Sequence, residues 1–423
     1  MRDVLVVGGG PAGAATAYWL AEAGHDVLVV ERKTFPRVKT CGDGLTPRAV
    51  KQLADMGLED DIARDHLRID GLRAMAHGVT LEMPWPEHPI YPSHGYVVRR
   101  RDLDQMVAER AVKAGATLWQ GAEAVAPVLE RGMVAGATIK RAGTEGKSCT
   151  EGKGGTTEEI TARYVVIADG ANSRFGRSLG TSRDRSYPQG MAIRTYYESP
   201  LHDDPWIESA LDVRDRNGAS LPGYGWIFPV GDGTINVGIG LLSTFRDWKS
   251  VNTSHLMAEW AATAPARWGI DPARPLAPPT GGRLPMAGSV SPKSGPTFLV
   301  VGDASGAINP FNGEGIDYAY ETGRLAADVL DEALTTGNGM ALQRYTETLD
   351  REFRLYYKVA RLFVQLIGYP TLMRELTRVG MQSRSLMEWV LRIMANLLRP
   401  DELGPAEAAY RTLSRIVAVT PGR

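Results

Sequence analysis

The stretch that decides the fold is Val4-Leu5-Val6-Val7-Gly8-Gly9-Gly10-Pro11-Ala12-Gly13-Ala14, close to the N-terminus. It joins an apolar run to the pattern G-x-G-x-x-G, and a helical pattern then continues to Ala23. A second apolar run, Val27 to Val30, follows and ends in the acidic residue Glu31. This order of strand, glycine turn, helix, strand and acid predicts a unit that binds a dinucleotide.

The three glycines of the pattern have different uses. Gly8 allows the tight turn, Gly10 lets the backbone approach a pyrophosphate, and Gly13 lets the helix pack closely on the strand. The helix N-terminus offers free N–H groups and the positive end of its dipole to phosphates. Glu31 is placed to accept a ribose hydroxyl, and its neighbour Arg32 is predicted to bind the same cofactor. The predicted cofactor-binding residues of the turn and helix are Gly8, Gly10, Pro11, Ala12, Gly13 and Ala14.

The composition is that of an ordinary globular chain, with 423 residues, of which 43% are hydrophobic and 23% charged. A net charge of −1 gives no case for nucleic acid, and two cysteines are too few for a disulfide framework. The seven histidines lack the spacing of metal ligands, so no metal is predicted. The chain has no apolar run of about 18 residues, and no signal peptide precedes the first strand pattern, which favours a cytoplasmic protein.

Changes of pattern divide the chain into three parts. Alternating β-type segments at 191–197 and 235–239 indicate an antiparallel sheet. A hairpin is expected over 131–164, and its tip at 143–157, which carries Cys149, is rich in Gly, Thr, Lys and Glu and is expected to be disordered. We therefore expect an α/β fold with a discontinuous Rossmann-like domain over 1–75, 95–185 and 281–335, a substrate domain over 76–94 and 186–280, and a C-terminal helical region over 336–423.

Two further segments place acidic and glycine residues directly after predicted strands. Asp169 follows the run Tyr164 to Ala168, and Asp303 follows the run from Thr297 to Val301. With the N-terminal pattern, these segments resemble the FAD-dependent oxidoreductases that have the p-hydroxybenzoate hydroxylase type of fold. The resemblance implies that FAD is the cofactor, that Asp303 accepts a ribityl hydroxyl, and that N–H groups at a helix start face the flavin N1–C2=O edge. The residues it implicates here are Asp169, Asp303, Gly313, Gly315 and Ile316.

Other parts of that resemblance concern arginines and the source of electrons. Arg100 matches the family pattern R-x-x-[LF]-D and is implied to contact the FAD phosphates or ribityl chain, and Ala124 is counted with the same cofactor site. The family motif D-G-x-x-S-x-x-R is imperfect, because Gly176 stands at its last position and Arg177 follows. Since the chain has no second G-x-G-x-x-G, electrons are expected from NAD(P)H that binds transiently or from another reductant.

Two motifs restrict the class of substrate that the protein is expected to bind. The segment Cys41-Gly42-Asp43-Gly44 follows the second predicted strand, where the chain is expected to turn back over the flavin. The motif Tyr224-Gly225-Trp226-Ile227-Phe228-Pro229, followed after eight residues by Gly238-Ile239-Gly240, puts three aromatic side chains on one face of a strand. Such a face suits a long apolar chain, although plain sheet core has the same pattern. Together with 312–318, these motifs resemble the geranylgeranyl reductase family, flavoproteins that saturate isoprenoid double bonds.

This second resemblance spans nearly the whole chain and implies a polyprenyl substrate. The three segments are most similar to the branch that reduces one double bond in the isoprenoid tail of menaquinone. Basic residues in 186–280 are scattered, as at Arg194, Arg214 and Arg216, which favours a neutral head group over a diphosphate. The implied cofactor contacts are Cys41, Gly42, Asp43 and Gly44, and the implied substrate contacts are Tyr224, Trp226, Phe228, Pro229, Gly238 and Gly240.

Reduction of an isolated alkene requires a proton as well as a hydride. We expect a dry pocket in which one alkene carbon is protonated while the other receives hydride. Cys41 is the candidate catalytic proton donor, because an unperturbed thiol with a pKa near 8.5 is mostly protonated at neutral pH. The alternative is that Cys41 only packs on the flavin edge.

The C-terminal helices carry a positive charge that the rest of the chain does not. The stretch from Arg354 to Arg399 contains eight basic residues and two acidic residues, Glu375 and Glu388, which gives it a net charge of +6. Leucine, methionine and tryptophan residues lie between them, a pattern typical of a membrane-surface face. We therefore expect peripheral association with the inner face of the cell membrane, and the alternative is helices that pack on the FAD domain with a solvated basic side.

Three other functions remain open from the sequence. A reductase of geranylgeranyl lipids or of geranylgeranyl diphosphate belongs to the same family. A flavin-dependent hydroxylase or halogenase shares the fold, and halogenases carry a W-x-W-x-I-P element close to the motif at 224–229. A non-catalytic carrier of a lipid quinone with structural FAD is the third.

Overall fold

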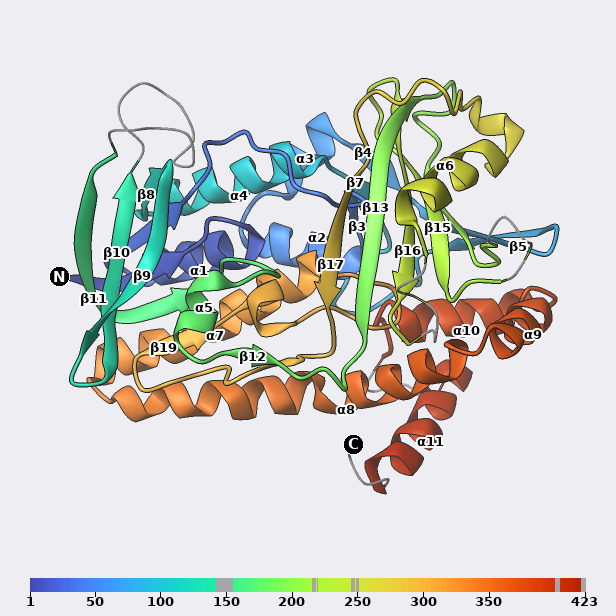
Figure 1. The fold of residues 1–423 in the computed structure, drawn as a ribbon. Helices are drawn as coiled ribbons and strands as arrows, with labels where there is room; N and C mark the ends of the chain where they lie inside the picture. Colours follow the sequence, from blue (N-terminus) through green and yellow to red (C-terminus); the bar gives the residue numbers. More distant parts are fainter. Residues whose placement is uncertain are drawn as a thin grey trace.

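The computed structural model describes residues 1–141, 155–214, 218, 220–244, 248, 251–399 and 404–419, and Figure 1 shows its fold. It is the expected mixture of an α/β part, a second sheet and C-terminal helices. Cys149 and most of the expected hairpin tip lie outside the described residues.

The first sheet holds the dinucleotide-binding pattern. Its order is β8-β2-β1-β11-β10-β9, and β19 pairs with β11. The pairs β1–β2, β1–β11 and β11–β19 are parallel, and their apolar runs are buried on both faces, as parallel strands require. The strands are β1 (Arg2–Val7), β2 (Val27–Glu31), β8 (Thr117–Gln120), β9 (Ala122–Glu130), β10 (Met133–Arg141), β11 (Thr157–Ile167) and β19 (Phe298–Val300).

Two expected boundaries differ in the structure. The second strand of the hairpin and the buried strand before Asp169 are one element, β11, which pairs antiparallel with β10 and then parallel with β1. The run Tyr96 to Arg100 has the sequence pattern of a strand, but the strand β7 covers only Gly95–Val97 and helix α4 begins at Arg100. Arg100 therefore lies in the first turn of a helix.

The second sheet is mostly antiparallel and has the order β17-β13-β16-β15-β14-β5-β6. It carries the aromatic motif on β15, between β14 and β16. The sheet takes in β5 and β17, which lie at the edges of the expected FAD-binding segments, and the division into domains stays a prediction. The strands are β5 (Gly71–Ala76), β6 (Val79–Pro84), β13 (Gln189–Glu198), β14 (Trp206–Ala210), β15 (Gly223–Pro229), β16 (Thr234–Leu242) and β17 (Thr280–Pro285).

Short strands and helices connect these sheets. One small sheet joins β3 (Gly44–Leu45), β7 and β4 (Leu67–Ile69), and another joins β12 (Ser182–Arg183) and β18 (Val290–Ser291). The helices of the first 315 residues are α1 (Pro11–Glu22), α2 (Pro47–Asp55), α3 (Glu59–Asp65), α4 (Arg100–Lys113), α5 (Arg174–Ser178), α6 (Thr253–Thr263), η2 (Ala266–Trp268) and η3 (Gly302–Ser305).

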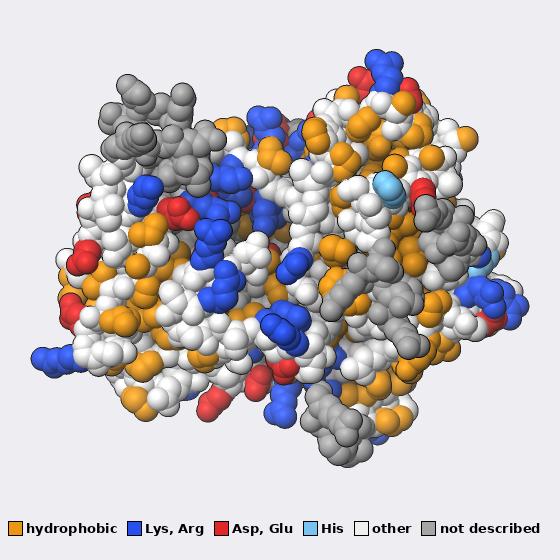
Figure 2. Space-filling view, viewed as in Figure 1, with side chains coloured by type: hydrophobic (Ala, Val, Ile, Leu, Met, Phe, Trp, Pro, Cys, Tyr) orange, Lys and Arg blue, Asp and Glu red, His pale blue; other side chains and the backbone are white. Residues whose placement is uncertain are grey.

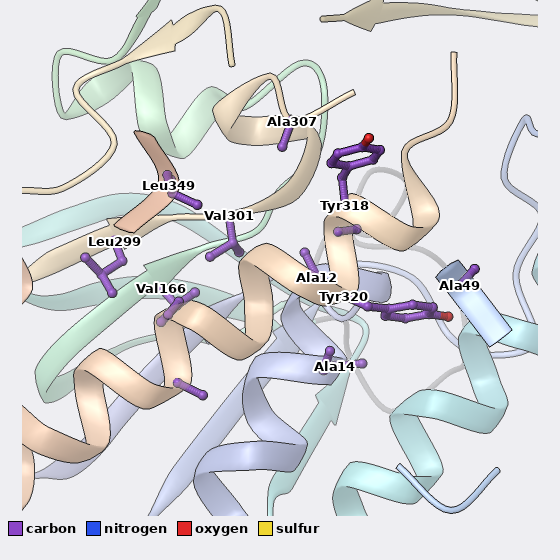
Figure 3. Packing of buried hydrophobic residues seen from close by; sticks show 14 of the residues in the cluster. Ala12, Ala14, Ala49, Val166, Leu299, Val301, Ala307, Tyr318, Tyr320 and Leu349 are labelled. Atoms are coloured by element: carbon purple, nitrogen blue, oxygen red, sulfur yellow. The ribbon is translucent and has the colours of Figure 1, made fainter. Parts of the chain in front are cut away.

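Helices α1 and α7 (Ile316–Thr336) pack against each other through small residues. A Cβ atom on Gly323 of α7 would lie 2.7 Å from the carbonyl oxygen of Ala12, so the two helices approach closely. Figure 3 shows Tyr318 and Tyr320 leaving the first turns of α7 in different directions, beside Ala12 and Ala14 of α1. This packing brings the starts of both helices to one region of the molecule.

The C-terminal region is helical, as expected. Helix α8 runs along the lower edge of the molecule in Figure 1, and α9 and α10 lie near the second sheet. Met387 and Leu391 of α10 share a hydrophobic cluster with Met83 of β6. The elements are η4 (Gly339–Leu342), α8 (Gln343–Ile367), α9 (Pro370–Gly380), α10 (Arg384–Met394) and α11 (Pro405–Val419).

Candidate functional site

The glycine turn after β1 is packed against the end of β11. Gly8 has a φ of +107°, and a Cβ atom on it would lie 2.4 Å from the carbonyl oxygen of Ala168. A Cβ on Gly13 would lie 1.9 Å from the carbonyl oxygen of Gly8, so larger residues do not fit at either position. Asp169, the residue after Ala168, is therefore held beside the start of α1.

Helices α1 and α7 both begin at a glycine that provides no side-chain cap. Gly10 is the N-cap of α1 and Pro11 its first residue, while Gly315 is the N-cap of α7 and Ile316 its first residue. Gly313, with a φ of +79°, turns the chain just before Gly315. Uncapped helix starts leave N–H groups free for an anionic ligand.

Asp169 and Asp303 place carboxylates beside these helix starts. Oδ2 of Asp169 accepts a hydrogen bond from the backbone N–H of Phe175 at 3.0 Å, whereas Oδ1 is buried with no hydrogen-bond partner among the described residues. Burial raises the pKa of the Asp169 carboxyl. Oδ1 of Asp303 lies 3.4 Å from the position of a Cβ on Gly315. Both aspartates can therefore accept hydrogen bonds from a ligand held between the helices.

Glu31 is buried and already has protein partners. Its carboxylate accepts hydrogen bonds from the backbone N–H groups of Gly9 at 3.1 Å and Lys33 at 3.0 Å. Arg37 lies 3.5 Å from Glu31 and pairs with Asp104 at 2.9 Å, and its Nε is buried without a hydrogen-bond partner among the described residues. A Cβ on Gly10 would lie 3.5 Å from Arg37, so this guanidinium borders the glycine turn.

Arg100 makes its contacts with acidic residues of this protein. Its guanidinium is buried and pairs with Asp104 through two contacts of 2.6 and 2.9 Å. Its backbone N–H donates to Asp43 at 3.2 Å, so Arg100 is linked to the segment Cys41–Gly44. Arg32 is exposed, and Ala124 is half-buried on β9 against the core of the first sheet. Arg100 is therefore linked to the candidate site, and the FAD contacts of Arg32 and Ala124 stay predictions.

The segment Cys41–Gly44 is held by side chains from strands β13 and β16 of the second sheet. Asp43 is fully buried with a φ of +67°, and it accepts hydrogen bonds from Tyr196 at 2.5 Å and Asn236 at 2.8 Å. The carbonyl oxygen of Cys41 accepts from Asn236 at 2.9 Å and Arg194 at 3.1 Å. Burial raises the pKa of the Cys41 thiol, while the positive charge of Arg100 opposes the shift. The thiol is thus held in its protonated form, next to a cation that stabilises its anion.

The three aromatic side chains of β15 lie in a row. The ring centroids of Tyr224 and Trp226 are 5.9 Å apart, and those of Trp226 and Phe228 are 6.2 Å apart. A Cβ atom on Gly238 would lie 2.1 Å from the Trp226 ring, so the glycine on β16 makes room for the indole. Gly240, farther along the strand, would bring a Cβ to 3.8 Å from the same ring.

The aromatic row contacts the segment that carries Cys41. Cβ atoms on Gly42 and Gly44 would lie 3.0 and 3.1 Å from the ring of Phe228. Trp226 is buried, whereas Tyr224 and Phe228 are half-buried, and Pro229 ends the strand. The Tyr224 hydroxyl donates to the carbonyl oxygen of Asn312 at 2.7 Å, which ties the second sheet to the segment before α7. The predicted cofactor and substrate motifs are therefore brought together in one region.

Two residues of this region escaped the sequence analysis. Arg37 follows β2 and lies over the glycine turn, and its position six residues after Glu31 carries no motif. Asn236 is fully buried on β16 and also accepts a hydrogen bond from the indole of Trp226 at 3.0 Å. A single amide inside the apolar run Ile235 to Ile239 was the available signal, because buried polar groups require partners.

Comparisons with known proteins agree with this geometry. The FAD binding domain family matches residues 1–352. The chain is 39% identical to the menaquinone reductase of Mycobacterium tuberculosis (strain ATCC 25618 / H37Rv) over 422 residues, covering 99% of this chain and 98% of that protein. It is 31% identical to digeranylgeranylglycerophospholipid reductase 1 of Methanopyrus kandleri over 374 residues, 86% of this chain and 90% of that protein. The chain belongs to the geranylgeranyl reductase family of FAD-binding proteins.

Solved structures show that the fold is shared more widely than this family. A geranylgeranyl bacteriochlorophyll reductase-like protein from Thermoplasma acidophilum has a TM-score of 0.77 at 22% identity, covering 97% of this chain and 99% of that chain. A flavin-dependent brominase has a TM-score of 0.72 at 18% identity, covering 99% of both chains. At these identities the similarity concerns the fold.

FAD is the cofactor of this family member, and the observed residues fit it. The uncapped starts of α1 and α7 suit the pyrophosphate and the N1–C2=O edge of the ring, and the orphan Oδ1 of Asp169 can accept a hydrogen bond. Arg37, bordering Gly10, would add a cation on the phosphate side. Which residues contact FAD remains a prediction.

The described residues lack a membrane-spanning helix and a metal-binding cluster. No helix there is both long enough and apolar enough to cross a membrane. The same residues contain no cluster of three or more His, Cys, Asp or Glu side chains placed to hold a metal ion.

Proposed function

We propose that this protein is an FAD-dependent reductase that saturates one C=C bond in the isoprenoid tail of menaquinone. The observation that carries the proposal is the contact between two motifs. The segment Cys41–Gly44, on the cofactor side, is packed directly against the aromatic row of β15. Menaquinone reductase is the name of the relative that is 39% identical over nearly the whole chain.

Different residues orient the substrate and donate the proton. FAD, when bound and reduced, supplies the hydride. Tyr224 and Phe228 offer apolar ring surface that orients a prenyl chain, and Trp226 with Gly238 fixes the strand from which they project. Cys41, whose pKa is raised by burial, keeps its proton at neutral pH and donates it to the alkene carbon that does not receive hydride.

A neutral head group fits the substrate sheet better than a diphosphate. Arg194 donates to the carbonyl oxygens of Lys39 and Cys41 and is therefore already engaged. Arg214 is exposed and bonds to the carbonyl oxygen of Gly218, while Arg216 lies outside the described residues. Geranylgeranyl lipids remain the second candidate substrate, because the Methanopyrus kandleri relative is named for one.

We also propose that the substrate is taken from the inner face of the cell membrane. Among the residues that the structure describes, ten of the twenty exposed large hydrophobic residues lie between Leu355 and Ile416. On α9, Leu372, Leu376 and Val379 form an exposed stripe beside Arg374 and Arg378, which are also exposed. Hydrophobic side chains gather at the lower right of Figure 2, where Figure 1 draws α9, α10 and α11.

The charge of the C-terminal helices supports a lipid leaflet as the occupant of this stripe. The excess of six positive charges between Arg354 and Arg399 complements a leaflet rich in anionic lipid. Each basic residue near such a surface contributes about 1 kcal/mol. A leaflet is also where a polyprenyl quinone is dissolved, so this docking would bring the site to its substrate.

The product of the reaction tests the proposed function. Purified holoenzyme is incubated without oxygen with menaquinone in detergent and a chemical reductant of the flavin, and the quinone is analysed by mass spectrometry. We expect a product two mass units heavier, with one saturated prenyl unit. A product that carries oxygen or halogen and forms only with O₂ would identify an oxygenase or halogenase instead, and flavin that cannot be reoxidised would identify a carrier.

A further inference from the structure

A cavity lies where helix α8 meets α7 and the loops around β18 and η3. Its volume is about 80 Å³. One water molecule needs roughly 10–15 Å³ of cavity volume, so this cavity has room for a phosphate group. The charged residues that line it are Lys293, Asp350, Arg354 and Arg361. We call these four residues and the space between them the basic cavity.

The three cations of the basic cavity have no acidic partner of their own. Within the part of the chain that the structure describes, none of them forms an ion pair, whereas Arg344 and Arg351 on the same helix pair with Glu332 and Glu352. Three cations and one acid leave the lining with a net charge of +2. The lining therefore carries positive charge that an anion can balance.

The ammonium group of Lys293 is held by the backbone. Its Nζ donates to the carbonyl oxygens of Gly288 at 2.9 Å and Val290 at 3.2 Å, which engages two of its three protons. Burial lowers the pKa of this ammonium, and the negative charge of Asp350 opposes the shift only in part. A half-buried cation without a counter-charge is unfavourable, so an anion in the basic cavity would stabilise it.

Arg361 is positioned by an aromatic ring instead of by a carboxylate. Its guanidinium carbon lies 4.1 Å from the ring centroid of Tyr187, which also lines the basic cavity. Such a contact uses the face of the guanidinium and leaves the N–H groups at its edge available, and these match the oxygens of a phosphate. Arg354 lies two helical turns earlier on α8 and lines the same space.

Further cations lie around the basic cavity. Nη1 of Arg183 donates to the carbonyl oxygen of Tyr187 at 3.1 Å. Burial and then the charge of Arg185 lower the pKa of Arg183, and Arg283 adds to the shift. The acid beside them, Asp184, already accepts two hydrogen bonds from its own loop. Figure 2 shows Lys and Arg side chains gathered in the middle of the face, where Figure 1 draws β12 and β17.

We propose that the basic cavity binds a phosphate group, either free or as a phosphomonoester. At pH 7 a phosphomonoester carries a charge of about −1.5 to −2, which balances the lining. The predicted cofactor site is a different place, because none of Asp303, Gly313 and Gly315 lines the cavity, and no residue of the glycine turn does. Ser305 and Ala307 line it from the loop after Asp303. The inference does not depend on the proposed function.

Calorimetric titration of the holoenzyme with inorganic phosphate, at constant ionic strength, tests the site. We expect one phosphate per chain, with a Kd of about 1 mM or lower. Arg361→Gln and Lys293→Gln should each weaken binding by about tenfold or more, because each removes a charged donor. Arg351→Gln, an exposed residue of α8 that does not line the cavity, is the matched control and should bind like the wild type. Equal affinity in Arg361→Gln and Arg351→Gln would overturn the proposal.

Vesicles distinguish the source of the phosphate. Phosphatidic acid presents a phosphomonoester and phosphatidylglycerol a diester, so vesicles of neutral lipid with one or the other are compared at equal surface charge. If the ligand is a lipid, the wild type should bind the phosphatidic acid vesicles several-fold more tightly, and Arg361→Gln should lose this preference. Equal binding to both vesicles, together with saturable binding of inorganic phosphate, assigns a soluble phosphate compound. A wild type that neither binds inorganic phosphate nor prefers phosphatidic acid overturns the proposal.

Discussion

The buried side-chain amide of Asn236 connects several parts of the candidate site. Its side chain donates to the carbonyl oxygen of Cys41 and to Asp43 and accepts from Trp226, so it connects the thiol segment to the aromatic row. A buried amide with every partner in place is rigid, because any displacement leaves a polar group unpaired. The distance between the thiol and the aromatic side chains is therefore set by a residue that needs no contact with substrate.

At the same scale, Cys41→Ser is the variant that tests proton donation. A serine hydroxyl keeps the size of the side chain but is a much weaker acid than a thiol, so we expect the reduction rate to fall by about 100-fold or more. FAD content and melting temperature should stay close to those of the wild type. Near-normal turnover with bound FAD would remove Cys41 from the donor role and leave it as a packing residue.

Helix α9 buries few of its side chains. Its buried residues are Thr377 and Gly380, while Leu372, Leu376 and Val379 are exposed on one side. An apolar stripe flanked by arginine is typical of a helix that lies in a membrane interface. The structure therefore offers a docking element beside the region where the second sheet meets the C-terminal helices.

The double variant Leu372→Ser and Val379→Ser tests this element. Burying one such side chain contributes roughly 1.5–3 kcal/mol, so we expect vesicle affinity to fall about tenfold or more. Co-sedimentation with vesicles rich in anionic lipid, at low salt, measures the effect. Val125→Ser and Leu129→Ser on β9 remove equally exposed apolar side chains far along the first sheet and should bind like the wild type. Equal binding by the two pairs, or no binding by the wild type, would contradict a membrane role for α9.

At the scale of the whole molecule, the side chain of Arg48 and the carbonyl oxygen of Met394 connect parts that are distant in the sequence. Arg48 of α2 donates to the Tyr91 hydroxyl at 2.9 Å and to the carbonyl oxygen of Asn396, after α10, at 3.1 Å. Asn309 and Tyr356 both donate to the carbonyl oxygen of Met394 at the end of α10. The C-terminal helices are thus bonded to the segment before α7 and to α2, and Arg48 also pairs with Asp317 and Glu321 of α7.

The buried carboxyl groups near Arg48 should make the stability of the protein depend on pH. Burial raises the pKa values of the Glu314, Asp317 and Glu321 carboxyls in the folded state. The folded protein therefore binds more protons than the unfolded chain above the ordinary carboxyl pKa. The free energy of unfolding should then fall as pH rises from about 5 towards the raised values. Asp317→Asn removes one of these protons and should flatten the slope, as measured by denaturant unfolding of the apoprotein. A slope equal to that of the wild type would show that Asp317 is ionised in the folded protein.

The sequence was informative wherever a function depends on a local pattern. Gly8 is required by its positive φ and Gly13 by its contact with the carbonyl oxygen of Gly8, and the row of Tyr224, Trp226 and Phe228 follows from the period of a strand. The end of the strand before Arg100 was placed wrongly, because a basic run carries no clear boundary signal. For Arg100 itself the resemblance implied an FAD contact, and the structure shows its guanidinium paired with Asp104 and its backbone bonded to Asp43.

The sequence by itself thus determined the α/β class, the dinucleotide turn and the aromatic strand, because each is encoded by spacing within a few residues. Only the tertiary structure decided that Asn236 joins Cys41 to Trp226, that Arg37 borders the glycine turn, and that Arg48 meets two carboxyl groups. These contacts join residues far apart in the chain. Their energies depend on burial and on the count of donors and acceptors, and neither exists until the sheets and helices have packed.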